Sequence, residues 1–283
     1  MSAVLSERQR RILAGDRNPK FLATVDASGE PNVVPIISLT PVEPGVVGFA
    51  EFMMWKTKQN LTATGVAALT ALDDRLNYFT ARARLRSFEN TGDLFEAIAR
   101  LPMFVHHPYN AIRAAGALEL EETGADGRLP PLRLLLTHLR AARLAQAATS
   151  GDVVPGPRTV PRLAAEKFGR LKAVKAVAWP VERAGGPSVD VLPAGGVAPV
   201  GERALVVADP SVASAVPEGS RVAVAVITTD PIAYQVKGVA RRWRGCLLVQ
   251  VTHSYSASPP LPGKPLLSDR TRTSGALSVT AGP

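Results

Sequence analysis

The sequence alternates between short apolar runs and clusters of turn-forming residues. Apolar runs bounded by Gly, Pro, Asn and Asp are typical of β-strands. A turn-forming stretch at residues 26–31 separates the first two runs and predicts a β-hairpin. Pro35 falls within the second run and cannot donate to a strand ladder, so it is expected at an edge or a bulge. The runs of the first half lie at residues 21–25, 32–39, 46–50, 66–72, 77–87 and 111–121.

Helical patterns are fewer. Ser6 precedes residues 7–14 and Gly15 follows them, which predicts a short helix with an N-cap and a glycine stop. Residues 132–148 have an apolar stripe and an arginine-bearing face, which predicts a long helix that acts as an interdomain connector or a dimer surface. Residues 149–161 are rich in Gly, Pro, Ser and Thr and are expected to form a linker.

The strand pattern of the first half returns in the second half with little identity of residues. Pro193 falls within the second run of this half, where the first half has Pro35, and the match in order predicts a tandem duplication. The returning runs lie at residues 174–179, 188–194, 204–209, 222–227, 232–240 and 245–253.

The duplication divides the 283-residue chain into four expected parts. Residues 1–125 form a first β domain, residues 126–165 a helical connector and linker, and residues 166–265 a second β domain. The tail at residues 266–283 is expected to be disordered, since it is rich in Ser, Pro, Gly and Thr.

One polar segment follows the third run and precedes a helix-compatible stretch. It contains Lys56, Thr57, Lys58 and Asn60 within five residues. Lysine ammonium groups, a hydroxyl and free N–H groups at a helix start are the donors that hold a phosphate. The alternative is that the same residues form an ordinary solvated helix start.

Composition and charge favour an anionic small molecule as the ligand. The net charge is +9, while aromatic residues make up only 5%, which disfavours a nucleic-acid stacking surface. No apolar stretch is long enough to cross a membrane, and the charged N-terminus does not resemble a secretory signal. A soluble, cytoplasmic protein is expected, in which the single cysteine, Cys246, is a buried apolar residue.

Residues 21–26 (FLATVD), 29–35 (GEPNVVP), 47–51 (VGFAE) and 56–61 (KTKQNL) together resemble a known family. The order and spacing of these segments are similar to those of the pyridoxamine 5′-phosphate oxidase-like, FMN-binding split β-barrel proteins. Residues 234–238 (YQVKG) resemble a later strand of the same barrel. The resemblance covers residues 5–72 well and residues 172–262 by pattern, and it implies two small antiparallel split barrels in tandem with short helices.

The resemblance also implies an FMN site at an interface between barrels, formed by a homodimer or by an intrachain pseudo-dimer. Its phosphate would be held by the polar segment after the third strand. The isoalloxazine ring would lie against the second strand and against residues 51–54, while Trp55 shields the flavin or forms an interface contact. The expected cofactor-binding residues are therefore Lys56, Thr57, Lys58, Asn60, Val34, Pro35, Ile36, Glu51 and Trp55.

The second half departs from this pattern. Residues 209–214 (DPSVAS) stand where the first half has the basic segment, which predicts one phosphate site per chain. Lys237 and Arg241 are interpreted as edge-strand guards against aggregation, with an anion-binding role as the alternative. The arginines at positions 82, 84 and 86 are expected on an exposed strand face.

The expected function is that of an FMN-dependent oxidoreductase whose substrate the sequence does not specify. One alternative is a non-catalytic binding or structural module that has lost flavin, and another is use of deazaflavin F420 or haem. His106 and His107 are the candidate haem ligands, although no further ligand stands near them at metal-binding spacing.

Overall fold

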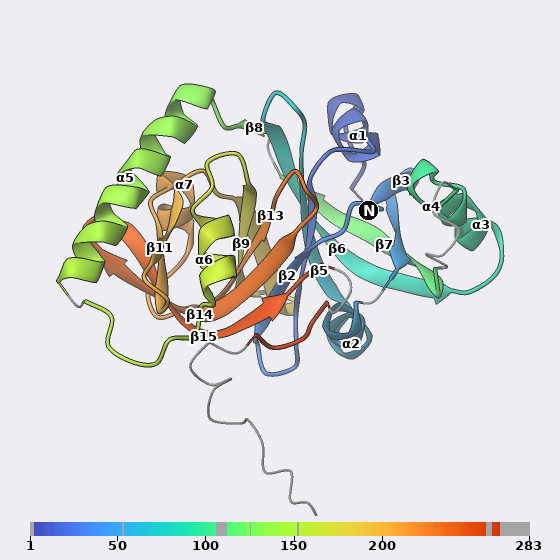
Figure 1. Ribbon diagram of the computed structural model, residues 1–283. Coiled ribbons are helices and arrows are strands. Elements are labelled where there is room, and N and C mark those ends of the chain that lie inside the picture. The colour runs from blue at the N-terminus through green and yellow to red at the C-terminus, as the bar shows by residue number, and fades with distance from the viewer. Residues whose placement is uncertain are drawn as a thin grey trace, which may run out of the picture.

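Two antiparallel β-sheets lie side by side in the protein, with helices at the ends and on the outer faces (Figure 1). The computed structural model describes residues 3–52, 54–105, 112–124, 126–151, 153–258 and 262–266. Within these residues the sheets have eight and seven strands. Residues 267–283 of the predicted tail at 266–283 lie outside the described residues, as do His106 and His107.

The first sheet has the order β2-β1-β5-β6-β7-β4-β3, with the short β8 paired to β6. Its strands are β1 (Lys20–Val25), β2 (Pro31–Pro35), β3 (Thr40–Glu43), β4 (Val46–Glu51), β5 (Val66–Leu72), β6 (Asn77–Glu89), β7 (Ala114–Thr123) and β8 (Gly127–Arg128).

The second sheet has the order β10-β9-β13-β14-β15-β12-β11. Taken in chain order, its strands repeat the order of the first sheet one for one, which confirms the predicted pair of tandem split barrels. These strands are β9 (Val174–Arg183), β10 (Gly186–Pro193), β11 (Val197–Val200), β12 (Ala204–Val207), β13 (Arg221–Ile227), β14 (Ala233–Trp243) and β15 (Cys246–Ser256).

The repeat extends to single hydrogen bonds. Lys20, the first residue of β1, and Lys175, the second residue of β9, lie at equivalent positions. Each backbone carbonyl accepts from the N–H of the residue after the proline that ends the paired strand, at 2.8 and 2.9 Å. Both long central strands also shift register at the same place, after Arg82 in β6 and after Lys237 in β14. The equivalence of Arg82 and Lys237 follows from these registers.

The helices occupy equivalent places only in part. Helix α1 (Glu7–Ala14) begins with a capping box made by Ser6 and Gln9, as predicted. Helices α2 (Trp55–Thr64) and α7 (Pro210–Ala215) follow the equivalent strands β4 and β12. Helix α6 (Arg162–Phe168) precedes β9 as α1 precedes β1. The others belong to one repeat or to the connection: α3 (Asp93–Ala99), α4 (Pro102–Val105) and α5 (Pro131–Ser150).

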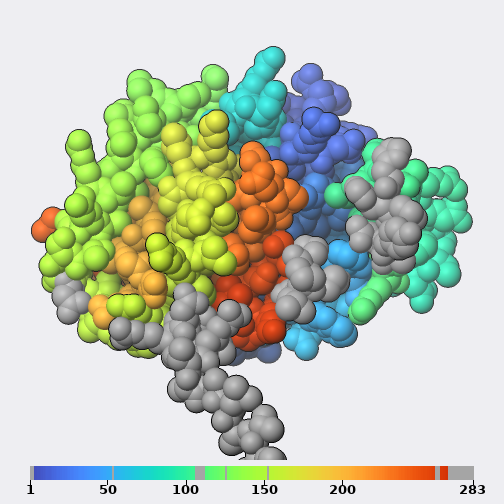
Figure 2. Space-filling model, in the orientation of Figure 1, coloured from blue at the N-terminus to red at the C-terminus, as the bar shows by residue number. Residues whose placement is uncertain are grey.

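A shared apolar core joins the repeats. It contains Phe21 and Val33 from the first sheet and Ala178, Val191 and Ala225 from the second, all buried. In Figure 2 the orange and red surface of the C-terminal repeat lies against the blue surface of the N-terminal repeat. The two barrels are therefore packed as an intrachain pseudo-dimer, which was one of the two arrangements expected from the sequence.

Two local predictions need correction. The predicted strand at residues 32–39 ends at Pro35, after which the chain bends before β3. The polar segment at residues 56–60 was expected to precede a helix, but it lies inside α2, which begins at Trp55. Cys246 is fully buried, and burial raises the pKa of its thiol, which confirms the structural role expected for it.

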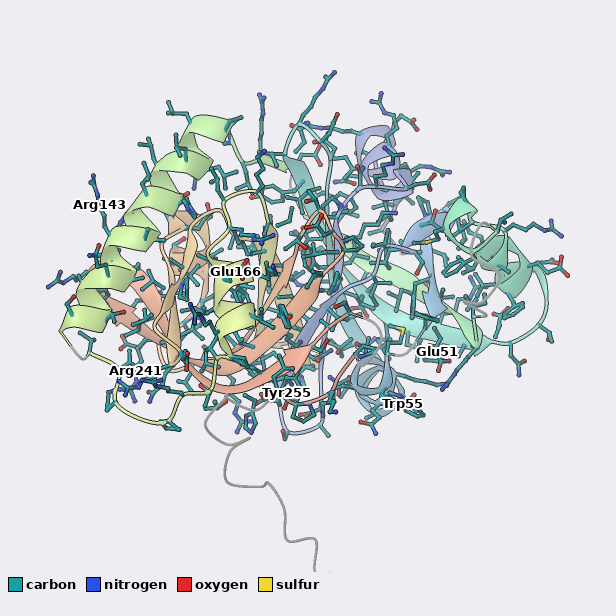
Figure 3. The ribbon with its side chains drawn as sticks, viewed as in Figure 1. Glu51, Trp55, Arg143, Glu166, Arg241 and Tyr255 are labelled. Atoms are coloured by element: carbon teal, nitrogen blue, oxygen red, sulfur yellow. The ribbon has the colours of Figure 1, made fainter. Side chains whose placement is uncertain are left out.

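The proposed division into domains at residues 125 and 165 stays a prediction. The connector around these positions contains α5, which packs its small residues Ala141, Ala145 and Ala148 against the second repeat. Its outer face carries Arg143, which points away from the sheet (Figure 3).

Candidate functional site

A cavity of about 490 Å³ lies where the two barrels meet. The N-terminal repeat contributes the end of β2, the following bend and the start of α2. The C-terminal repeat contributes β14, the end of β15 and the residues that follow it. The lining includes Asn32, Val34, Pro35, Ile36, Ile37, Phe52, Met54, Trp55, Lys56 and Thr57 from the first repeat, and Ile227, Ala233, Gln235, Lys237, Tyr255, Ser256 and Ser258 from the second.

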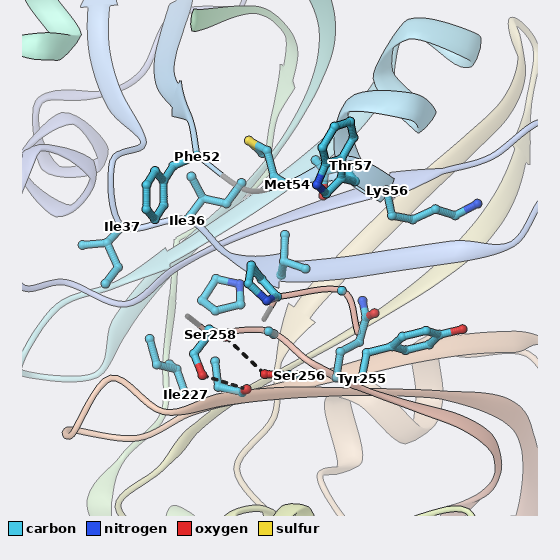
Figure 4. Close-up of a pocket in the computed structure, with 18 of the residues that line it drawn as sticks. Ile36, Ile37, Phe52, Met54, Lys56, Thr57, Ile227, Tyr255, Ser256 and Ser258 are labelled. Carbon is cyan, nitrogen blue, oxygen red and sulfur yellow. Dashed lines mark hydrogen bonds between the residues drawn. The ribbon is translucent and has the colours of Figure 1, made fainter. Parts of the chain in front are cut away.

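The cavity is apolar at one end and charged at the other. Figure 4 shows Ile37, Phe52 and Ile227 toward one side, and Lys56 and Tyr255 toward the opposite side. This polarity suits a ligand with a flat apolar part and an anionic part, because each end then keeps a compatible environment.

Helix α2 brings its first turn to the charged end. Trp55, Lys56 and Thr57 line the cavity there, and no described side chain caps the start of the helix. The first intrahelical bond runs from Lys58 N to Met54 O at 2.9 Å, so the N–H groups of the preceding residues remain free for a ligand. Thr57 Oγ1 accepts a hydrogen bond from Asn32 Nδ2 at 3.1 Å, which leaves its own hydrogen available for donation.

Lys56 is held by a carboxylate. Its Nζ lies 2.9 Å from Asp26 Oδ2, and 44% of the lysine side chain is exposed. Burial acts to raise the pKa of Asp26, but the hydrogen bonds from Lys56 and Ser28 and from the Glu30 N–H hold that pKa well below its usual range. Asp26 is therefore a firmly ionised partner that keeps Lys56 at the cavity.

Lys237 reaches the cavity from the second repeat. It lies on β14, which is paired on both sides, by β13 and β15, so its interpretation as an edge-strand guard is wrong. Only 4% of Lys237 is exposed. Its Nζ lies 3.8 Å from Glu30 Oε1 and 5.9 Å from the centre of the Tyr255 ring. Burial lowers its pKa, and the charge of Lys56 lowers it further, against the raising effect of Glu30.

Gln235 fixes the two repeats to each other beside the cavity. Its Nε2 donates to Asn32 Oδ1 at 3.1 Å and to Val33 O at 2.7 Å, and all these groups are buried. Asn32 in turn donates to Thr57, so a continuous chain of hydrogen bonds runs from β14 to α2. The cavity walls are thus held in one relative position by both barrels.

Six of the predicted site residues line this cavity: Val34, Pro35, Ile36, Trp55, Lys56 and Thr57. Trp55 is 65% exposed, and the Arg113 guanidinium lies 5.5 Å from its ring centre. The sequence analysis did not identify Gln235, Tyr255 and Ser256 as site residues, although it expected the site at an interface between barrels.

The other three predicted site residues lie away from the cavity. Lys58 Nζ pairs with Glu51 Oε2 at 2.7 Å, on a different surface groove that also includes Phe88. Asn60 is buried and donates to Thr24 Oγ1 at 3.0 Å. The cause is the helical turn of about 100° per residue, which spreads neighbouring side chains around α2. Figure 3 shows Glu51 and Trp55 at neighbouring positions and Tyr255 from the other repeat.

In the second repeat, an aspartate cap and helix α5 lie beside the strands that correspond to β2 and β4. Asp209 caps α7, where its Oδ1 accepts from Ser211 N at 3.0 Å and its Oδ2 accepts from Gly195 N at 2.9 Å. Gly196 lies directly against Thr137 of α5, where even a Cβ atom would meet the helix backbone at 2.5 Å. A carboxylate and a helix therefore lie at the region that corresponds to Ile37 and Ser38, while the region that corresponds to the charged end is a smaller cavity of about 200 Å³ beside Arg82 and Asp190.

The arginines of β6 differ in their surroundings. Arg84 and Arg86 are half exposed and pair with Glu121 and Glu43, in agreement with the predicted exposed face. Arg82 is only 20% exposed at its side chain and bridges the repeats, with Nε 2.6 Å from Asp190 Oδ1.

The described residues contain no group of three or more His, Cys, Asp or Glu side chains that could hold a metal ion. None of the helices within the described ranges is long and apolar enough to cross a membrane.

Comparison with known proteins gave matches among solved structures alone: no family model matches, and no curated protein does. An FMN-binding protein from Syntrophomonas wolfei is 19% identical with a TM-score of 0.37, and the match covers 44% of this chain and 86% of that one. An F420 reductase is 16% identical with a TM-score of 0.35, covering 42% and 98%. The haem storage protein HutZ from Vibrio cholerae is 14% identical with a TM-score of 0.33, covering 44% and 97%.

These similar structures have names that refer to FMN, F420 and haem, so they do not distinguish between the cofactors. Because each match spans less than half of this chain at a low score, the two-barrel fold rests on the strand orders and registers of the two sheets.

Proposed function

We propose that the cavity between the barrels binds FMN and that the protein is a flavin-dependent oxidoreductase related to the pyridoxamine 5′-phosphate oxidase-like proteins. The observation that carries the proposal is the polarity of the cavity. An apolar slot ends at an uncapped helix start that presents Lys56 and Thr57.

The chain's own groups fit such a cofactor. A volume of about 490 Å³ lies in the range of roughly 300–1,000 Å³ that is usual for small-molecule sites. Val34 and Ile36 offer an apolar wall to a flat ring, while Lys56, Thr57 and the free N–H groups of α2 offer donors to a phosphate. In the second repeat, the carboxylate of Asp209 caps the equivalent helix, which supports one site per chain.

A bound flavin supplies the hydride and electron chemistry, and the protein supplies position and electrostatics. Lys56 and Thr57 would anchor the phosphate by charge-assisted and hydroxyl hydrogen bonds. Asn32, which Gln235 holds in place, donates a hydrogen bond to Thr57 Oγ1. The hydroxyl hydrogen of Thr57 would then be free to donate to the phosphate. The walls contributed by both repeats would exclude water from the ring.

The test is a titration of the purified protein with FMN, followed by quenching of flavin fluorescence. Lys56→Gln is expected to weaken FMN binding at least about fivefold, because it removes one charged donor to the phosphate. Lys58→Gln is the matched control: it removes the same charge two residues along, but from a side chain that pairs with Glu51 outside the cavity.

Wild-type protein that neither carries nor binds FMN would refute the proposal. Equal weakening by both substitutions would refute the assignment of the phosphate to the start of α2. Competition with F420 or haem in the same titration distinguishes the alternative cofactors, since all three are anionic and the charged end of the cavity suits each of them.

A further inference from the structure

We infer that Lys237 of the second repeat joins Lys56 of the first in a two-barrel clamp on the terminal phosphate of the ligand, and that this clamp selects phosphorylated over neutral flavins. The inference rests on the proposed function and deepens it. It makes the second repeat, which has no phosphate segment of its own, a necessary part of the single site.

The first step is the position of Lys237. Its side chain is almost fully buried, yet it lines the cavity from the central strand β14. Within the described part of the chain its carboxylate partner is Glu30, whose Oε1 lies 3.8 Å from the Lys237 Nζ, at the far limit of such a contact. A buried ammonium group without close pairing is costly, because it has lost water without a full replacement. A ligand anion in the cavity would supply that replacement.

The second step is convergence. Lys56, Lys237 and Tyr255 all line the same cavity although they come from different barrels, and Lys56 and Tyr255 lie toward the same side of it (Figure 4). Tyr255 also places its ring beside the Lys237 ammonium, at 5.9 Å. Lys56 and Lys237 therefore converge on the charged end of the cavity from opposite repeats.

The third step concerns Glu30, the carboxylate beside Lys237. It lies between Lys237 and Arg221, whose Nη1 is 3.7 Å from Glu30 Oε2. Arg221 also donates to Ser28 O at 3.0 Å, which fixes it to the same turn. When a phosphate engages Lys237, Glu30 keeps Arg221 as its counter-ion, so no carboxylate is left unpaired.

The sister position shows the opposite arrangement. Arg82, the equivalent of Lys237, is neutralised by close contacts with Asp190 and Glu122. Its positive charge is balanced by these two carboxylates, of which Asp190 belongs to the other repeat. The clamp is thus present at one of the two pseudo-symmetric places.

The experiment compares FMN with riboflavin, which has the same ring system and no phosphate. Lys237→Gln is expected to weaken FMN at least about tenfold while riboflavin changes less than twofold, because the loss falls on the phosphate. Lys237→Arg should restore most of the FMN affinity, since it keeps the charge. Lys172→Gln, which removes a lysine from an exposed position in the same repeat, is the charge control and should change neither ligand.

A second variant keeps the test independent of folding at position 237. Glu30→Gln removes the competing carboxylate and is expected to tighten FMN severalfold without tightening riboflavin. Thermal melts of each variant without ligand show whether it folds.

Equal weakening of FMN and riboflavin by Lys237→Gln would overturn the clamp and leave Lys237 a structural role, and so would an unchanged FMN affinity. If the wild-type protein does not bind FMN, the proposed function fails. The clamp is then tested by measuring whether inorganic pyrophosphate stabilises the protein against thermal unfolding. Stabilisation of the wild type that Lys237→Gln abolishes and Lys172→Gln retains would support it. No such stabilisation would overturn it.

Discussion

Two lysines at equivalent positions, Lys20 and Lys175, carry amino groups into the cores of the repeats. Lys20 Nζ donates to Ile37 O at 3.0 Å and to Leu39 O at 2.8 Å, so it holds the bend that follows β2 and supports one wall of the cavity. Burial lowers the pKa of each lysine to about 8, and nearby Asp16 offsets part of this effect for Lys20. The repeated placement argues that these lysines serve the fold of each barrel.

The first residue-scale prediction follows from these pKa values. In the folded protein both lysines lose a proton near pH 8, whereas in the unfolded chain they do so near pH 10.4. Between these values the unfolded chain binds more protons, so the free energy of unfolding should rise with pH. For each lysine this rise in the free energy of unfolding is about 1.4 kcal/mol per unit of pKa difference, and it develops above pH 8.

Urea unfolding at pH 7.5, 8.5 and 9.5 measures this rise. Lys20→Met should lower the slope, because one of the two titrating groups is gone, while Lys172→Met should leave it unchanged. A Lys20→Met protein with the slope of the wild type would contradict the assignment of the lowered pKa.

At the scale of elements, the two helices that follow equivalent strands have opposite starts. Helix α2 begins without a side-chain cap, and α7 begins with Asp209 as its N-cap and Pro210 in its first turn. The uncapped start faces the cavity, and the capped start lies under α5. The two helix starts are one of the differences between the candidate site and its counterpart in the second repeat.

The stability of the capped start can be tested directly. Asp209→Ala removes acceptors from two backbone N–H groups, those of Ser211 and Gly195, and is expected to lower the free energy of unfolding by about 2 kcal/mol. Asp230→Ala is the control, because the Asp230 side chain is 70% exposed and its ion pair with Arg170 is long, at 3.9 Å. Chemical denaturation of the three proteins gives the comparison, and equal stabilities would contradict the role of Asp209.

The elements also show where sequence reasoning succeeds and where it stops. The strands were predictable because apolar runs and turn residues mark them, and the short helix after Ser6 because its cap is explicit. The start of α2 was misplaced because Met54 and Trp55 carry no capping side chain, so the polar residues that follow had the composition of a turn. Without the helical geometry, the divergence of Lys56 from Lys58 was not visible.

Lys237 is the instructive miss at the site. A lysine in an apolar run has the same local pattern on an edge strand and on a central strand, and pairing on both sides of β14 decides between them. Its place in the cavity depends on how the second sheet packs on the first, which involves residues about 200 positions apart, such as Gln235 and Asn32. Local sequence carries no record of that packing.

At the scale of the whole molecule, duplication has made an interface that is symmetric in its strands and asymmetric in its chemistry. Each repeat packs its second strand on the other repeat, and the shared apolar core lies between them. One flank keeps a cavity of about 490 Å³ with Lys56 and Lys237, and the other has a smaller cavity of about 200 Å³ in which Arg82 pairs with Asp190.

This asymmetry predicts one flavin per chain. A protein with two equivalent barrel interfaces would bind two. The region equivalent to the charged end instead contains Arg82 paired with Asp190 and Glu122, so a phosphate there would meet like charge at these carboxylates. FMN titration with the chain concentration fixed by amino-acid analysis should therefore saturate at one equivalent, whatever the oligomeric state measured by light scattering. Saturation at two equivalents would show that the cavity beside Arg82 and Asp190 also accepts a flavin, and saturation at one half would mean that a second chain completes the site. Either value would contradict a site that is assembled within a single chain from Lys56 of one barrel and Lys237 of the other.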